Sequence, residues 1–150
     1  MTERVDFYVL ASAAPGSRLA FACRLTEKAY LRNLRVIVLA ESAADVAAMD
    51  DLLWTFNDRS FVPHKVRLDA QAEESATPVH LCVEPPVAPT ADLAVNLASR
   101  LPLQPERFAR IAEIIDADPQ RRQLGRERFK SYRDLKFTLE THQLDGPEDP

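Results

Sequence analysis

Short hydrophobic runs recur along the first part of the chain, and the segments between them predict a strand–helix–strand order. Residues Val5–Leu10 (VDFYVL) and Arg35–Ala40 (RVIVLA) are rich in β-branched and aromatic side chains, as strands are. The second run is apolar at nearly every position, which is typical of a strand covered on both faces. Between them, Ser17–Asn33 repeats apolar side chains at three- and four-residue spacing, the period of a helix. A unit of this length predicts a parallel, right-handed crossover.

The same pattern continues after the second strand. Ser42, followed three residues later by Asp45, is a candidate N-cap for a helix that runs to about Trp54. Further short apolar runs predict strands at Val79–Val83 and Leu93–Leu97. The fold class that follows is α/β, with a mainly parallel sheet flanked by helices.

The remaining segments are less regular. Phe108–Ile115 (FARIAEII) is compatible with a helix or a strand, and we favour a strand because the run is short and lies between prolines. Leu68–Thr77 is polar and is expected to be a loop, as is the proline-rich segment 85–89. Phe137–Leu139 is a candidate last extended piece, and residues 140–150 are expected to form a frayed acidic tail. The whole chain, residues 1–150, is predicted to form a single domain.

A basic helix is predicted over Pro119–Lys136, with Asp118 as N-cap and Pro119 at the first helical position. Helical spacing places one group of side chains on the outward face, namely Arg122, Arg126, Phe129, Lys130 and Arg133. The opposite side, where a packed body could lie, carries Leu124, Gly125, Arg128, Ser131, Tyr132 and Leu135. The outward face therefore joins four cations to one aromatic ring.

Positive charge is concentrated in this helix. Residues Ala117–Lys136 carry a net charge of +4 in a chain whose net charge is −4, so the remainder carries −8. Such a face suits a ligand with carboxylates or phosphates beside an apolar group, although a merely solvated helix face has the same spacing. The acidic balance of the whole chain argues against a general binder of duplex DNA.

Composition favours a cytoplasmic protein. No hydrophobic run approaches the roughly 20 residues of a membrane span, and the N-terminus enters a strand pattern directly rather than a signal peptide. Cys23 and Cys82 are isolated in the sequence, as reduced buried thiols are.

The residues give no support for catalysis, a metal or a cofactor. Gly16, Gly125 and Gly146 are too scattered for a phosphate-binding loop. The three histidines show no metal-ligand spacing with each other or with the cysteines, and a hydrogen-bonded structural role is expected for His64. His80 is expected to be packed or half-exposed within its strand.

Three large aromatic side chains lie close together in the segment Trp54–Val62, namely Trp54, Phe56 and Phe61. They are compatible with a corner of the core. They are equally compatible with an exposed patch for a protein partner, because aromatic residues are favoured interface anchors.

Several segments, in their order and approximate spacing, resemble the chi subunit of bacterial DNA polymerase III. They are VDFYVL, RVIVLA, LLWTFNDRSFVPH and RERFKSYRDLKF, and the most specific pieces are Ser60–His64 with Trp54, and Arg126–Arg133. The resemblance implies a Rossmann-like fold without a phosphate loop and a non-catalytic role in the clamp-loader assembly. It also implies two partners, the psi subunit and the acidic, Phe-ending C-terminal tail of single-stranded DNA-binding protein (SSB), so that contact with nucleic acid is mainly indirect.

The resemblance also implies where these partners bind. Arg122, Arg126 and Lys130 would meet the carboxylates of the SSB tail, and Phe129 and Ile115 would wall a slot for its last ring. The psi subunit would bind Trp54 and Phe61. Two rival functions remain open, a direct binder of single-stranded nucleic acid that stacks bases on Phe129, and a small nucleotide-using α/β enzyme.

Overall fold

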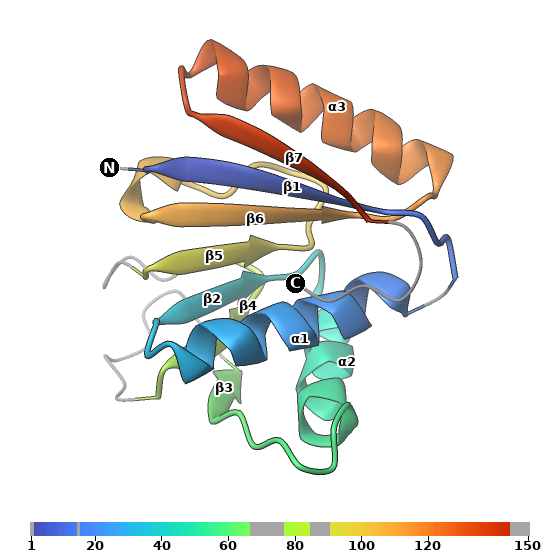
Figure 1. Ribbon diagram of the computed structural model, residues 1–150, viewed down its shortest axis with the longest axis vertical. Helices are drawn as coiled ribbons and strands as arrows, with labels where there is room; N and C mark the ends of the chain where they lie inside the picture. The colour runs from blue at the N-terminus through green and yellow to red at the C-terminus, as the bar shows by residue number, and fades with distance from the viewer. Residues whose placement is uncertain (1, 15, 67–76, 85–90, 145–150) are drawn as a thin grey trace.

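The computed structural model describes residues 2–14, 16–66, 77–84 and 91–144 (Figure 1). Its strands are β1 (Arg4–Leu10), β2 (Val36–Leu39), β3 (His64–Val66), β4 (Val79–Cys82), β5 (Leu93–Asn96), β6 (Arg110–Ile115) and β7 (Leu139–Leu144). Its helices are α1 (Ser17–Leu31), α2 (Ala43–Thr55), the 3₁₀ helix η1 (Pro105–Arg107) and α3 (Pro119–Asp134). None of the described helices is both long enough and apolar enough to cross a membrane.

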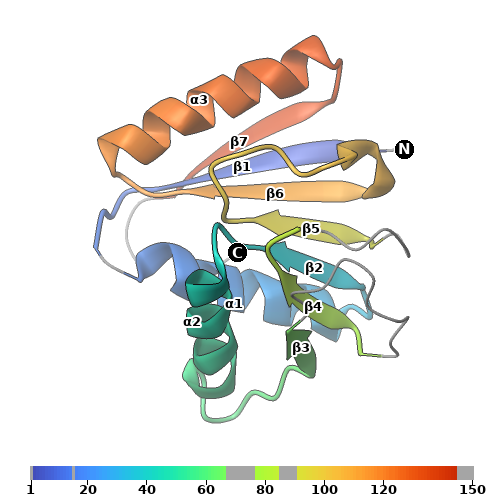
Figure 2. The same ribbon diagram turned by 180° about the vertical axis from the view of Figure 1, so that it is seen from behind.

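The seven described strands form one sheet in the order β3-β4-β2-β5-β6-β1-β7, and every neighbouring pair is parallel. The predicted α/β class with a mainly parallel sheet is therefore confirmed. Because β1 lies between β6 and β7, the connection through α1 passes over β6 and β5 before the chain re-enters the sheet at β2. Figures 1 and 2 show α3 at the β7 end of the sheet, far from α2.

Hydrophobic side chains fill both faces of the sheet. On β6, Ala112 and Ile114 belong to the core under α1 and α2, whereas Ile111 and Ile115 pack on the other face with Tyr132 of α3. The strand at Arg110–Ile115 confirms the choice of a strand for this segment, and its burial on both faces explains why its sequence lacks a clear alternation. A single long helix, α3, thus lies over the β6–β1–β7 side of one face.

The C-terminal segment differs from the prediction. Residues 139–144 form β7, which pairs with β1 over its whole length, so residues 140–144 belong to the sheet and not to a frayed tail. The polar sequence of β7 hides this role because its exposed side chains face solvent at the sheet edge. Strand β3 was not predicted, because it has only three residues and follows a proline. The expected loops at 68–77 and 85–89 lie almost wholly outside the described residues, as do residues 145–150.

A buried carboxylate joins α3 to the sheet. Glu113 of β6 has no exposed surface, and its Oε1 accepts a hydrogen bond from Arg128 Nε at 3.0 Å. Its Oε2 accepts from Asn96 Nδ2 at 2.8 Å and from the Tyr132 hydroxyl at 2.7 Å. Arg128 also donates from Nη1 to the Ser99 carbonyl oxygen at 3.0 Å. The Glu113 carboxylate therefore connects β5 and β6 to α3, and Arg128 also connects the loop after β5 to this helix.

The charged form of this carboxylate depends on its donors. Burial raises the pKa of the Glu113 carboxyl, whereas Arg128, Asn96 and the Tyr132 hydroxyl oppose that rise. Burial and the neighbouring Glu113 raise the pKa of Tyr132, which keeps its hydroxyl protonated as a donor. Loss of one partner would leave the other charge buried and unpaired, which is much more costly than loss of a surface pair.

We predict that Arg128→Ala lowers the free energy of unfolding by about 3–5 kcal/mol, because Glu113 then stays buried without its cation. The loss should shrink as the pH falls toward about 5, since an unpaired Glu113 with a raised pKa takes up a proton in the folded state. Urea denaturation at the two pH values measures both effects. Arg133→Ala, an exposed arginine on the same helix, is the control and should change stability by less than about 0.5 kcal/mol.

Candidate functional site

A slot of about 300 Å³ lies between α3 and the adjoining face of the sheet, and we call it the α3 slot. Its walls come from four elements, β1, β6, α3 and β7. The lining residues are Phe7, Val9, Ile115, Arg122, Gly125, Arg126, Phe129, Thr141 and Gln143.

The apolar part of the slot is built by two rings and one aliphatic side chain. Phe7 and Phe129 meet edge to face, with ring centroids 5.2 Å apart and an interplanar angle of 62°. Ile115 is buried against Gly125, whose missing side chain lets α3 approach β6, because a Cβ at this position would collide with Ile115 Cδ1. Phe129 is only partly buried, so part of its ring remains available to a ligand.

Two arginines border this apolar surface, and they are held differently. Arg122 donates from Nε to the Asp116 carbonyl at 3.2 Å and from Nη2 to the Leu10 carbonyl at 3.1 Å, so its guanidinium is tied to the ends of β6 and β1. Arg126 is exposed and donates from Nη2 to Gln123 Oε1 at 2.7 Å. The slot thus has one fixed cation and one that can reorient onto an anion.

The start of α3 is fixed next to the slot. The Asp118 side chain accepts a hydrogen bond from the Arg121 amide at 2.9 Å, which confirms it as the N-cap. Asp116 receives Arg121 Nε and Nη2, both at 2.8 Å. Burial alone would raise the pKa of the Asp116 carboxyl, but Arg121 and the Asp118 amide hold that pKa below its ordinary value. These contacts fix the first turn of α3 and thereby the position from which the Arg122 side chain extends.

The structure brings together four of the five side chains that the sequence placed at an acidic-peptide site, namely Ile115, Arg122, Arg126 and Phe129. Lys130 is exposed on α3 but does not line the slot. The sequence reasoning missed the strand residues that complete it, Phe7, Val9, Thr141 and Gln143, because these reach the slot through strand pairing. Leu135, placed on the inward side, is 53% exposed because it follows the last helical residue.

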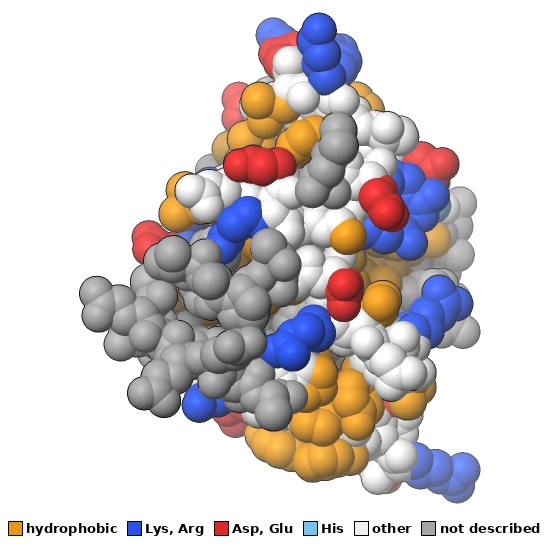
Figure 3. Space-filling view, turned by 90° about the vertical axis from the view of Figure 1, so that its left-hand side faces the viewer, with side chains coloured by type: hydrophobic (Ala, Val, Ile, Leu, Met, Phe, Trp, Pro, Cys, Tyr) orange, Lys and Arg blue, Asp and Glu red, His pale blue; other side chains and the backbone are white. Residues whose placement is uncertain are grey.

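An exposed aromatic patch lies at the far end of the molecule, and we call it the Trp54 patch. Trp54 is 50% exposed and Phe61 is 64% exposed, with ring centroids 5.6 Å apart. In Figure 3 hydrophobic side chains gather at the lower end of the molecule, the end at which α2 and β3 lie in Figure 1. Phe56 instead packs partly buried against the core, so the structure divides the three aromatics between the two alternatives.

The buried side chain of His64 packs against the Trp54 ring of this patch. The ring of His64 lies 4.4 Å from that of Trp54, with its side chain fully buried. Its Nδ1 lies 2.7 Å from the Val62 carbonyl and its Nε2 lies 2.8 Å from Asp50 Oδ1. The hydrogen-bonded structural role expected for His64 is confirmed, and it holds the loop after α2 in place.

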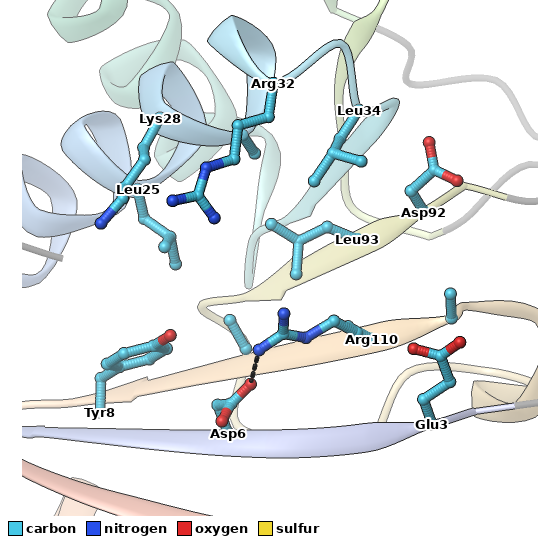
Figure 4. Close-up of a pocket in the computed structure, with 13 residues that line it drawn as sticks. Glu3, Asp6, Tyr8, Leu25, Lys28, Arg32, Leu34, Asp92, Leu93 and Arg110 are labelled. Atoms are coloured by element: carbon cyan, nitrogen blue, oxygen red, sulfur yellow. Dashed lines mark hydrogen bonds and ion pairs between the residues drawn. The ribbon is translucent and has the colours of Figure 1, made fainter.

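A second cavity, of about 310 Å³, opens between α1 and the sheet (Figure 4). Arg32, the residue that follows α1, and Arg110 of β6 extend into it from its two walls. Arg110 donates to Asp6 Oδ2 at 2.9 Å, and Glu3 and Asp92 add further carboxylates. The mixed charge of this cavity gives it no clear preference for an anion or a cation.

One group of described side chains has the spacing of a metal site, namely Asp6, Glu140 and His142. Asp6 already accepts Arg110, and its Oδ1 lies 3.0 Å from both Arg4 Nε and His142 Nε2. These side chains compete with a metal for the same carboxylate, so the geometry favours a hydrogen-bonded cluster around Asp6.

Comparisons with known proteins agree with one another. A family model described as DNA polymerase III chi subunit, HolC, matches residues 1–140. The chain is 38% identical to DNA polymerase III subunit chi of Pseudomonas aeruginosa, over 94% of this chain and 96% of that protein. It is 26% identical to the protein of the same name from Haemophilus influenzae, over 96% and 99% of the two chains.

The fold also resembles a solved structure outside this group. The crystal structure of T4 UvsW matches 95% of this chain and 41% of its own, with a TM-score of 0.67 and 12% sequence identity. At that identity the likeness concerns the fold alone.

We predict that Gly125→Ala lowers the free energy of unfolding by about 1–2 kcal/mol, because its Cβ overpacks against Ile115 and outweighs the better helix propensity of alanine. Ile115→Val removes the methyl group that collides. The double variant Gly125→Ala/Ile115→Val should therefore be more stable than the sum of the single effects predicts. Urea denaturation of the four proteins closes the cycle, and strict additivity would contradict this account of the contact.

Proposed function

The chain belongs to the DNA polymerase III chi subunit family, and on that premise we propose that it links the clamp loader to SSB-coated template during DNA replication. As a chi subunit it is an accessory subunit of the polymerase and not its catalytic one. In this proposal the psi subunit binds the Trp54 patch, and the C-terminal tail of SSB binds the α3 slot. We place the complex in the cytoplasm, where replication takes place in bacteria.

The tail assignment rests on one observation, namely that cationic and apolar side chains line the same slot. An acidic tail that ends in phenylalanine offers a terminal carboxylate, acidic side chains and one ring. Arg122 and Arg126 suit the carboxylates, since guanidinium groups form charge-assisted hydrogen bonds with them. Ile115, Phe7 and Phe129 suit the ring. Lys130 lies one turn further along α3 and would contact acidic residues outside the slot.

Such a contact is expected to be weak and sensitive to salt. Arg126 is exposed, and exposed charges are screened beyond about 10 Å at 0.1 M ionic strength. The slot is also small, so the buried apolar area is limited. A micromolar affinity would nevertheless suffice, because many SSB tails on one coated strand raise the effective concentration of the ligand.

The position of the second patch supports a linking role. Trp54 lies at the end of α2, which is at the opposite end of the molecule from α3 (Figure 1). Half-exposed aromatic rings fixed by a buried histidine are suited to anchor a protein partner, because little side-chain entropy is lost on binding. Two partners could therefore bind without competing for space.

The two rival functions fit the site less well. For a direct binder of single-stranded nucleic acid, a basic groove would have to follow the phosphate backbone, but the residues outside Ala117–Lys136 carry a net charge of −8. For a nucleotide-using enzyme, the crevice at the carboxyl ends of the strands would have to accept phosphates. That crevice combines the carboxylates Glu41, Asp45 and Asp116 with three arginines. The arginines already bind protein acceptors: Arg18 the Leu97 carbonyl, Arg121 the Asp116 carboxylate and Arg128 the Glu113 carboxylate.

We predict that Arg126→Ala weakens binding of an acidic, Phe-ending peptide by about tenfold or more, because it removes a charge-assisted contact in the slot. Arg133→Ala makes the same change of charge on the same helix, outside the slot, and should alter affinity by less than about twofold. Fluorescence anisotropy at rising salt measures both. Equal effects of the two variants, or an affinity that does not fall with salt, would contradict the assignment.

We also predict that Trp54→Ala with Phe61→Ala abolishes detectable binding of psi in size-exclusion chromatography, while peptide binding in the α3 slot is unchanged. Truncation of buried aromatic anchors at an interface costs about 2 kcal/mol or more each. Leu103→Ala, at another exposed hydrophobic side chain, is the control and should keep psi bound. Retention of psi by the double variant would place its interface elsewhere.

A further inference from the structure

Strand β7 ends the described sheet and pairs on one side only, with β1. We propose that the tail peptide binds as an added strand, pairing its main chain with the open edge of β7 while its side chains enter the α3 slot. This inference rests on the proposed function, because it takes the acidic, Phe-ending tail as the occupant.

The open edge presents a defined set of backbone groups. The Val5 amide donates to the Thr138 carbonyl at 2.8 Å, and the Ala11 amide donates to the Leu144 carbonyl at 3.1 Å. In a parallel ladder, the amide and carbonyl groups of successive residues point to alternate sides of the strand. Those of the even-numbered residues of β7 therefore face β1 and bond to it. The amides and carbonyls of Leu139, Thr141 and Gln143 therefore point away from β1, toward the edge.

The same residues connect this edge to the α3 slot. Side chains of Thr141 and Gln143 line the slot, which means that the outward backbone row and the slot belong to one surface. In a strand paired to β7, every second side chain would point to the side on which α3 lies. One extended peptide could thus form main-chain hydrogen bonds and insert a ring beside Phe129.

Charge favours an acidic occupant over an apolar one. Side chains of the added strand that face α3 would meet the exposed Arg126 and the fixed Arg122, and further along the helix Lys130. The edge itself is polar at Thr141 and Gln143, so it offers little apolar surface to a second hydrophobic strand. Alternate acidic residues in the peptide match this arrangement.

The edge is also held rigidly, which lowers the cost of pairing with it. Six residues of β7 are in register with β1. In addition, His142 Nε2 lies 3.0 Å from Asp6 Oδ1, and the His142 ring stacks on the Tyr8 ring with centroids 4.9 Å apart. Arg4 Nη1 lies 3.1 Å from Glu140 Oε2 on the same side of the strand. A preorganised edge loses little entropy when a peptide binds.

Amide hydrogen exchange of the full chain, read residue by residue by NMR with and without the peptide, tests this directly. Exchange at Thr141 and Gln143 should slow by about tenfold or more at saturating peptide, because their amides become hydrogen-bonded. The amides of Glu140 and His142 already face β1 and should change by less than about twofold. No slowing at Thr141 and Gln143 while the peptide is bound would overturn the proposal.

A matched pair of variants gives an independent readout. Thr141→Pro removes one outward amide and leaves the bonds to β1 in place, since proline is tolerated on an edge strand when its nitrogen faces solvent. It should weaken peptide binding by about three- to tenfold, the worth of one hydrogen bond. Thr141→Ala removes the hydroxyl and methyl groups of the same slot-lining side chain but keeps the amide, so Thr141→Pro should bind the peptide about three- to tenfold more weakly than Thr141→Ala. Equal affinities for the two variants would count against pairing.

The peptide itself supplies a test that does not depend on the folding of any variant. N-methylation of successive peptide amides, one at a time, should weaken binding at every second position, because only alternate amides face β7. A uniform effect along the peptide would overturn the added strand.

The outcomes separate this proposal from the one it rests on. Binding that depends on Arg126 but shows neither protection nor alternation would leave the SSB-tail assignment standing and remove only the strand pairing. No binding of the peptide at all would remove both. Protection of Thr141 and Gln143 that grows with protein concentration in the absence of peptide would show that a second copy occupies the edge, and would overturn the proposal.

Discussion

The buried pair of Glu113 and Arg128 is the contact on which the geometry of this molecule depends. A parallel sheet ordinarily uses apolar packing to hold its helices, but here α3 is also tied to β5 and β6 through one carboxylate that accepts three donors. Such a pair contributes little net stability compared with a hydrophobic replacement, and its value lies in orientation. Because Arg128 must point toward Glu113, α3 has one rotation about its own axis. That rotation determines which side of the helix faces solvent.

That rotation decides which residues meet in the α3 slot. Gly125 allows the helix to approach Ile115, and Arg122 reaches back to carbonyl groups at the ends of two strands. Arg126, one turn later, is left exposed at the rim. The same helix thus uses Arg128 to hold the fold and Arg122 to shape the slot, and it leaves Arg126 exposed for the proposed ligand. Only their partners in the tertiary structure distinguish the three arginines.

The fold by itself says little about this role. T4 UvsW shares the arrangement of strands and helices with 12% identity, whereas the curated chi subunits share both sequence and length. What makes the chain suited to a linking role is where its two sites lie, with the Trp54 patch at the end of α2 and the α3 slot at the opposite edge of the sheet. A linker needs two surfaces that can be occupied together, and a sheet with helices at its two ends supplies them.

Local periodicity and end signals such as Asp118 were enough to predict the α/β class, the parallel crossover, most strands and helices, and the capped basic helix. The sequence also placed Arg122, Arg126, Phe129 and Ile115 at one site through the resemblance to chi subunits. Three features became visible in the folded chain alone: Glu113 pairs with Arg128, the polar segment 139–144 is a strand, and Phe7, Thr141 and Gln143 complete the slot. Local patterns do not encode these features, because the pairing of strands distant in the chain and the partner of a buried charge depend on long-range contacts.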